Sequence, residues 1–301
     1  MSGERILVLG NVNVDLVMGE VDGWPAVGTE VILPRSEMRA GGSAGNTALA
    51  LSGLGVPHRL IAGVGADMMG DWLSAQFDGQ FSTWIAMDVA TTVTVGIVHA
   101  GGDRAFFTTT GHLHQSRLDD LVQRLPAAPG EKNFAIISGG FLMPEIETGT
   151  SELIAALKRL GWTVAIDPGW PTGGWTARNR AQMQTWMNEA DFSLINAEEA
   201  MGIVDAEQLE AALDTLFLSL APAKIIVVKC GADGVRILAG DRVRSIEAPE
   251  VEVVDTVGAG DTFNAAFLAA LSEDADLAEA AARGVRAASS ALSTFPRRYD
   301  A

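Results

Sequence analysis

The residues best suited to chemistry lie in the segment Asp255-Thr-Val-Gly-Ala-Gly-Asp261, which follows an apolar run. Gly258, Ala259 and Gly260 are small and precede apolar residues at helical spacing, so their amides would lie at a helix N-terminus. Such amides can bind a phosphate, and Asp261 beside them can accept the proton of an attacking hydroxyl. The segment is compatible with phosphoryl transfer, although a capped helix after a glycine turn explains the same pattern.

A glycine pair near the N-terminus could admit a polyol. Gly41 and Gly42 let a ligand approach the backbone, and Asn46 begins a helical pattern with a donor and an acceptor on its side chain. The alternative is a glycine loop in which Asn46 only caps the helix.

Alternating polar residues precede this pair. Asn11, Asn13 and Asp15 point the same way if the chain is extended, and beyond the end of a sheet they could bind neighbouring hydroxyls. A solvated strand face is the alternative.

Two later strand ends could serve a nucleotide. Acidic residues at a helix start can hold Mg²⁺ through water, which is one interpretation of Asn196 and Glu199. Lys229, Gly231 and Gly234 follow the next apolar run, where a glycine turn could hold a nucleotide. Helix capping and a hairpin turn are the respective alternatives.

Positioning these residues requires strands that end at a common edge. Short apolar runs alternate with amphipathic segments, which predicts a mostly parallel sheet with helices on both faces. We expect strands at 5–10, 59–64, 134–138, 164–167, 192–196 and 225–229, and helices at 45–54, 69–77, 151–160, 178–189, 209–220, 262–271 and 277–293.

Two segments, at about 12–39 and 91–112, interrupt this alternation. The first contains Val31-Ile-Leu. The second contains alternating threonine and valine residues at 92–95 and a turn expected at 101–103. Both predict a β-ribbon that covers one end of the sheet as a lid. No linker or repeat divides the chain, so residues 1–301 are expected to form a single domain.

The composition excludes several classes of protein. The net charge of −17 disfavours binding to nucleic acid or an anionic membrane through bulk charge. Cys230 is the only cysteine, so an intrachain disulfide is excluded. No apolar stretch approaches the ~18 residues of a membrane span. We therefore expect a cytoplasmic protein. His112 and His114 lack a nearby third ligand and are interpreted as surface or lid histidines rather than a metal site.

Taken in order, these segments resemble the ribokinase-like, or PfkB-type, carbohydrate kinases from Gly10 to about Ala291. The C-terminal segment that ends at Asp261 matches that family's signature closely. The other similar stretches are Gly41-Gly42-x-x-x-Asn46, Gly63-Val-Gly65-x-Asp67-x-x-Gly70 and Asn196-x-x-Glu199.

The resemblance implies an α/β fold: a ribokinase-like three-layer αβα sandwich with a mostly parallel central sheet and a small β-sheet lid, often used for homodimerisation. It also implies ATP-dependent transfer of the γ-phosphoryl group to a sugar hydroxyl, with Mg²⁺ and, in many members, K⁺. The implied roles are Asp261 as base; Gly258, Ala259 and Gly260 as anion hole; Asn13, Asp15, Gly41, Gly42 and Asn46 for substrate; Asn196, Lys229, Gly231 and Gly234 for nucleotide; Glu199 for Mg²⁺ through water; and Asp255 with the Val257 carbonyl for a monovalent cation.

Departures from the family weaken a specific assignment as ribokinase or fructokinase. Ser43 stands where ribokinases tend to carry lysine, and Ser138-Gly-Gly-Phe141 lacks their sugar-binding glutamate. A nucleoside kinase remains an alternative, with Trp24, Phe106 and Phe107 as candidate base-stacking residues. A non-catalytic sugar or nucleotide sensor is a third hypothesis, disfavoured because Asp261 and its glycine turn are intact.

Overall fold

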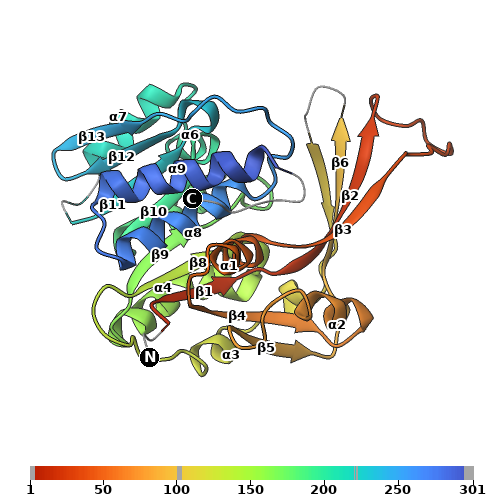
Figure 1. Cartoon of the computed structure of the whole chain (residues 1–301), viewed down its shortest axis with the longest axis horizontal. Coiled ribbons are helices and arrows are strands. Elements are labelled where there is room, and N and C mark those ends of the chain that lie inside the picture. The colour runs from red at the N-terminus through yellow and green to blue at the C-terminus, as the bar shows by residue number, and fades with distance from the viewer. Residues whose placement is uncertain (1–3, 100–103, 220, 222, 295–301) are drawn as a thin grey trace.

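The computed structural model describes residues 4–99, 104–219, 221 and 223–294. A nine-stranded sheet forms its centre (Figure 1). From one edge to the other the strands are β13 (Arg242–Ile246), β12 (Val235–Ala239), β11 (Ile225–Lys229), β10 (Phe192–Asn196), β9 (Thr163–Asp167), β8 (Phe134–Ser138), β1 (Ile6–Gly10), β4 (His58–Gly65) and β5 (Ser82–Met87). The strands from β11 to β5 are parallel, whereas β12 and β13 form an antiparallel edge.

Helices cover both faces of this sheet. Every residue of β1 and β8 is buried, as expected for parallel strands enclosed on two sides. One face carries α1 (Ser43–Gly53), α2 (Met68–Ser74), α8 (Ala259–Ser272) and α9 (Leu277–Leu292). The other carries α3 (Leu118–Val122), α4 (Pro144–Arg159), α5 (Ala177–Glu189), α6 (Ala197–Val204) and α7 (Leu209–Ser219). The predicted αβα sandwich is confirmed.

A smaller four-stranded sheet projects from one end of the molecule (Figure 1). Its strand order is β3 (Ser36–Gly41), β2 (Asn13–Val21), β6 (Val93–His99) and β7 (Arg104–Thr108). Residues 31–33, expected within the ribbon, lie instead in an exposed loop, because the pairing of β2 with β3 stops at Met18–Ser36. The turn expected at 101–103 lies outside the described residues.

Hydrogen bonds fix the root of the smaller sheet. Asp67 accepts hydrogen bonds from the backbone and hydroxyl of Thr91, at 2.8 and 2.6 Å. His112 accepts one from the Thr92 amide at Nδ1, which leaves the proton on Nε2, 3.0 Å from the Val12 carbonyl. The expectation of a surface or lid histidine is wrong for His112, which is fully buried because both ring nitrogens have backbone partners.

The order of the central strands has a switch point between β1 and β8. From β1 the chain proceeds outward through β4 and β5 and then returns to β8 on the other side. Ligands of open α/β sheets bind beyond the carboxyl ends of the strands at such a switch point. The chain is crowded there: Asn11 follows β1, and a Cβ on Gly139 (φ 66°) would lie 1.9 Å from Asn11 Oδ1.

Some elements differ from expectation. Helix α4 begins at Pro144, earlier than predicted, because proline is well placed at the first helical position. Helix α3 and the strands β5, β12 and β13 were not predicted, and α6 was predicted only as a helix start after Asn196. No helix in the described ranges is long and apolar enough to cross a bilayer.

Candidate active site

The N-terminus of α8 faces the carboxyl edge of the sheet. Gly258 precedes the helix in the left-handed region, with φ 72°, a conformation that glycine adopts without steric cost. Among the described residues, no side chain caps this helix. The first turn, with Ala259 and Gly260, therefore has the backbone donors and positive helix end that suit an anion.

The first turn of α8 also carries Asp261, which meets a distant helix. Asn46 in α1 donates a hydrogen bond from Nδ2 to Asp261 Oδ2, at 2.9 Å, across 215 residues of sequence. Asn46 is buried and Asp261 is half-buried. The structure thus brings together the predicted base and a predicted substrate residue.

The other predicted substrate residues lie close to one another, and the Gly42 carbonyl accepts a hydrogen bond from the Asn46 amide at 2.8 Å. Asn13 Nδ2 donates to Asp15 Oδ1 at 2.7 Å and to Thr94 Oγ1 at 3.1 Å. The Asp15 carboxylate lies against Gly41, where a Cβ would fall 2.0 Å from Oδ2. At Gly42 (φ 81°) a Cβ would fall 2.4 Å from the Asn11 carbonyl. Both glycines are therefore required by the close approach of polar groups.

A buried ion pair lies beneath the helix terminus. Lys229 at the end of β11 donates from Nζ to Asp167 Oδ2 at 2.8 Å and to Asn264 Oδ1 at 3.2 Å. Burial lowers the pKa of Lys229, but the Asp167 and Glu199 carboxylates outweigh burial and raise it overall. The ammonium group is therefore permanently charged, and it lies 3.4 Å from where a Cβ of Gly260 would be.

Glu199 is buried at the start of α6, and its contacts form a capping box. Its Oε2 accepts from the Asn196 amide, and the Asn196 side chain accepts from the Glu199 amide, both at 2.8 Å. Burial and the nearby Asp167 carboxylate raise the pKa of Glu199 to about 7, against the opposing effect of Lys229. The carboxyl groups of Glu199 and Asp167 together favour a cation near this point.

A cleft adjoins the N-terminus of α8 and contains most of the predicted nucleotide residues. It is bounded by residues of β11, the following turn, α8 and α9: Lys229, Gly231, Gly234, Val235, Ala248, Ala259, Gly260, Phe263, Val285, Ala288, Ser289 and Leu292. Its walls are mostly apolar, and Ala259 and Gly260 of the predicted anion hole are among its lining residues. An aromatic base with an attached phosphate chain suits this arrangement.

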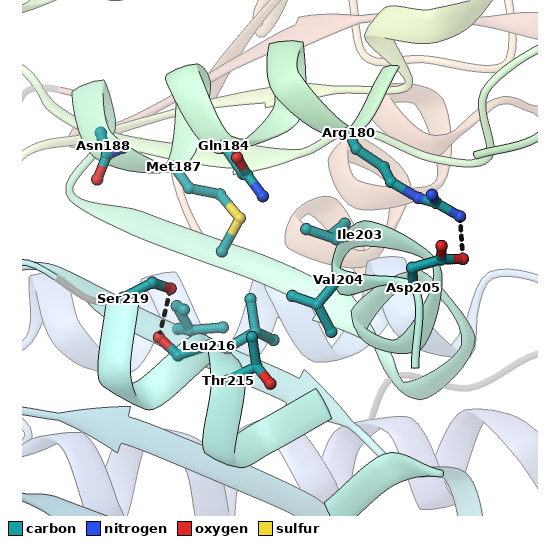
Figure 2. A pocket seen from close by; sticks show the side chains of 11 residues that line it. Arg180, Gln184, Met187, Asn188, Ile203, Val204, Asp205, Thr215, Leu216 and Ser219 are labelled. Atoms are coloured by element: carbon teal, nitrogen blue, oxygen red, sulfur yellow. Dashed lines mark hydrogen bonds and ion pairs between the residues drawn. The ribbon is translucent and has the colours of Figure 1, made fainter. Parts of the chain in front are cut away.

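A larger cavity of about 310 Å³ lies elsewhere, between α5, α6 and α7 (Figure 2). Met187, Ile203 and Leu216 form its apolar wall, and the ion pair of Arg180 with Asp205 lies at its rim. None of the predicted site residues lines it. Three of the predicted nucleotide residues, Lys229, Gly231 and Gly234, line the smaller cleft instead.

Sequence reasoning missed three polar residues of the site. Asp167 ends β9 before a Pro-Gly turn, and Asn264 follows Asp261 by three positions on the same face of α8. Arg39 lies two residues before Gly41 and forms an ion pair with Asp255, whose Oδ1 accepts from the Val257 amide at 3.0 Å. Spacing identifies Asn264, whereas Asp167 and Arg39 have partners that only the fold reveals.

Similarity to known proteins extends over nearly the whole chain. The family model described as "pfkB family carbohydrate kinase" matches residues 4–296. The ribokinase of Bacillus subtilis strain 168 is 28% identical over 295 residues, which cover 97% of this chain and 94% of the relative.

Solved structures show the same fold. Arabidopsis thaliana ribokinase complexed with ribose and ATP has a TM-score of 0.78 at 20% identity, covering 97% of this chain and 94% of that one. A Burkholderia thailandensis nucleoside kinase in complex with inosine has a TM-score of 0.75 at 20% identity, covering 98% and 93%.

Proposed function

The chain belongs to the pfkB family of carbohydrate kinases, and from this premise we propose that it moves the γ-phosphoryl group of ATP to a hydroxyl of a small sugar or sugar-like substrate. The observation that carries the proposal is the hydrogen bond of 2.9 Å between Asn46 and Asp261. It joins the N-terminal substrate segment to the helix that provides the anion hole.

In this proposal the substrate lies between the smaller sheet and α8. Asn13, Asp15 and Asn46 bind its hydroxyl groups, since together they offer amide donors and a carboxylate acceptor. The glycines at 41 and 42 leave space for it. Asp261 orients the attacking hydroxyl and accepts its proton late, because phosphoryl transfer passes through a loose transition state.

ATP fits the cleft beside α8. The apolar walls near Gly231 and Gly234 suit the adenine, and the amides of residues 258–260 suit the transferring phosphoryl group. Lys229 adds a fixed positive charge beneath this turn. When bound, ATP supplies the phosphoryl group, and the protein contributes position and electrostatic stabilisation.

Mg²⁺ fits this site as a companion of the nucleotide. The described residues contain no cluster of three or more acidic or histidine side chains that could hold a metal. Mg²⁺ in kinases is commonly bound by phosphate oxygens, water and one or two carboxylates. Glu199, with its raised pKa, and Asp167 are the carboxylates that would face it through water.

We propose that the smaller sheet acts as a lid on one kinase domain spanning residues 1–301. Its two faces differ, since Asp15, Arg39 and Thr94 share one face and Leu16, Met38 and Val95 share the other. The first face carries the polar substrate residues. The second is apolar and would suit a homodimer contact.

A nucleoside substrate is the second candidate, favoured by the position of Phe106. Phe106 pairs with Gly96, and the register places both on the Asp15 face of the lid. Phe107 lies on the opposite face and contacts Trp24, with ring centroids 5.9 Å apart. Of the three aromatic candidates, only Phe106 is therefore placed to stack on a substrate base.

The deciding experiment measures ADP release with Mg²⁺ and ATP over a panel of pentoses, hexoses, polyols and nucleosides. We expect turnover of at least one sugar. Nucleoside turnover alone would favour the second candidate. Tight sugar binding without any turnover would overturn the kinase assignment and favour a sensor.

A further inference from the structure

The ion pair between Arg39 and Asp255 links the lid to the turn before α8. Arg39 lies in β3 and Asp255 lies 216 residues later. Arg39 Nη1 donates to Asp255 Oδ2, and Nη2 lies 2.8 Å from a carboxylate oxygen of Glu37. The guanidinium group therefore connects a strand of the smaller sheet to the segment that forms the anion hole.

The Asp255 carboxylate organises this turn. It is 9% exposed, and a carboxylate so buried requires compensating charge and hydrogen bonds. Its Oδ1 accepts from the Val257 amide, directly before Gly258. One oxygen thus fixes the backbone that leads into α8, and the other pairs with the guanidinium group of Arg39 in β3.

A monovalent metal ion, which family resemblance implies at Asp255 and the Val257 carbonyl, does not fit this arrangement. The carboxylate already accepts an amide hydrogen on one oxygen and a guanidinium hydrogen on the other. A metal cation there would face the positive charge of Arg39 at short range in a partly buried place. Burial lowers the pKa of Arg39, but Asp255 and Glu37 raise it overall, so its charge is permanent.

We infer that Arg39 is a positioning residue that takes the place of a monovalent metal ion at Asp255. The guanidinium supplies the positive charge that holds the anion-hole turn, and this kinase therefore needs no K⁺ for activity. The inference rests on the proposed function, since it concerns the same site.

The first test uses the unaltered protein with its best substrate, at equal ionic strength in KCl, NaCl or choline chloride. We expect kcat values that agree within about twofold, because the cation is part of the chain. Activation by K⁺ of about tenfold or more over choline would overturn the inference.

The second test uses Arg39→Ala. In choline chloride its kcat should fall by about tenfold or more, and guanidinium at about 10 mM, or K⁺, should restore much of it. Arg39→Lys should retain more activity than Arg39→Ala without K⁺. The control Arg283→Ala removes an exposed arginine that pairs with Glu279 on α9, and it should show no cation dependence. Loss of activity in Arg39→Ala that neither cation restores would contradict the inference.

A third readout does not depend on turnover. The Tm of Arg39→Ala should rise on replacing choline by K⁺ or by ~10 mM guanidinium, because the buried carboxylate then regains a cation. The Tm of the unaltered protein should respond equally to KCl and choline chloride. These Tm values test the role of Arg39 even if no substrate is ever turned over. A rise in Tm specific to K⁺ in the unaltered protein would refute that role, and so would the absence of any rise in Tm with either cation in Arg39→Ala.

Discussion

Asn46 Nδ2 lies 2.9 Å from Asp261 Oδ2, although the two residues belong to helices at opposite ends of the chain. Helices α1 and α8 pack on the same face of the central sheet, and their N-termini meet near its carboxyl edge. The amide fixes one oxygen of the carboxylate. The proposed base, held in this way, needs little reorganisation when the substrate hydroxyl arrives.

Replacing Asp261 by Asn should lower kcat by about 10²–10⁴-fold, because the proton acceptor is lost. Sugar affinity should change little, since an amide of the same shape occupies the position. ADP release and calorimetric sugar binding measure the two effects. Asp276→Asn is a matched control, because Asp276 also lies at a helix N-terminus and accepts from the Glu279 amide. A kcat within tenfold of normal in Asp261→Asn would show that another group is the base.

Asn46→Asp should shift the acid limb of the profile of kcat/KM against pH upward. The substitution places a carboxylate where an amide now donates to Asp261, and like charges at hydrogen-bond distance raise the pKa of the pair. The base is then ionised only at higher pH. We expect a shift of about 1–2 pH units, measured by ADP release. An unshifted acid limb would mean that Asp261 does not control the rate.

Gly42→Ala should destabilise the protein more than Gly55→Ala. Both glycines have positive φ, 81° and 69°, so alanine has a similar backbone cost at each. A Cβ at Gly42 would also lie 2.4 Å from the Asn11 carbonyl, whereas nothing lies within 4 Å at Gly55. We expect a loss of about 2–4 kcal/mol at Gly42 and about 1 kcal/mol at Gly55 by urea unfolding. Only Gly42→Ala should also raise KM for the sugar. Equal losses of stability in the two variants would mean that the Asn11 carbonyl moves away from the added methyl group at little cost.

The sequence predicted the main strands well, because a parallel sheet requires compact apolar runs. The ranges expected for β8, β10 and β11 agree with the observed strands at both ends. Elements without that signal were missed. Strand β13 is almost entirely exposed, and α3 has only five residues.

Contacts between candidate residues could be predicted where the residues share a strand face, as Asn13 and Asp15 do. Contacts between residues that only tertiary packing brings together could not be predicted from the sequence. Lys229 meets Asp167 because β9 and β11 flank β10. Arg39 meets Asp255 because β3 leads into α1, which contacts α8. Such contacts follow from strand order, which no single segment specifies.

The stability of the Glu199→Gln variant, relative to that of the unaltered protein, should increase as pH rises. The pKa of Glu199 is about 7 in the folded protein against 4.5 for the free group, so the folded state binds more protons between these values. Stability from this group is therefore full below pH 4.5 and lost as pH rises through 7. Glutamine does not titrate, so its advantage over glutamate should grow by about 1–3 kcal/mol from pH 5 to 8.5.

Urea unfolding at several pH values, without nucleotide, measures this difference. Glu279→Gln is a suitable control, because Arg283 hydrogen bonding lowers the pKa of that exposed carboxyl group. The relative stability of the control should not increase over the same range. If the difference in the free energy of unfolding between Glu199→Gln and the unaltered protein does not change with pH, Glu199 is ionised normally.

Phe106→Ala and Phe107→Ala should have different effects, although the side chains are neighbours of similar exposure, 57% and 55%. Strand alternation directs Phe106 to the Asp15 face of the lid and Phe107 to the face with Trp24. If the substrate is a nucleoside, Phe106→Ala should raise its KM by about 10–100-fold, because stacking on an aromatic ring contributes about 1–3 kcal/mol. If the substrate is a free sugar, KM should change by about threefold or less.

Phe107→Ala should leave KM within about twofold and instead weaken association of the lid's apolar face. Steady-state kinetics and sedimentation at several protein concentrations separate the two outcomes. A larger KM effect from Phe107 than from Phe106 would contradict the assigned faces. A monomer at every concentration for the unaltered protein would refute the homodimer, while the KM comparison would still report which face of the lid contacts the substrate.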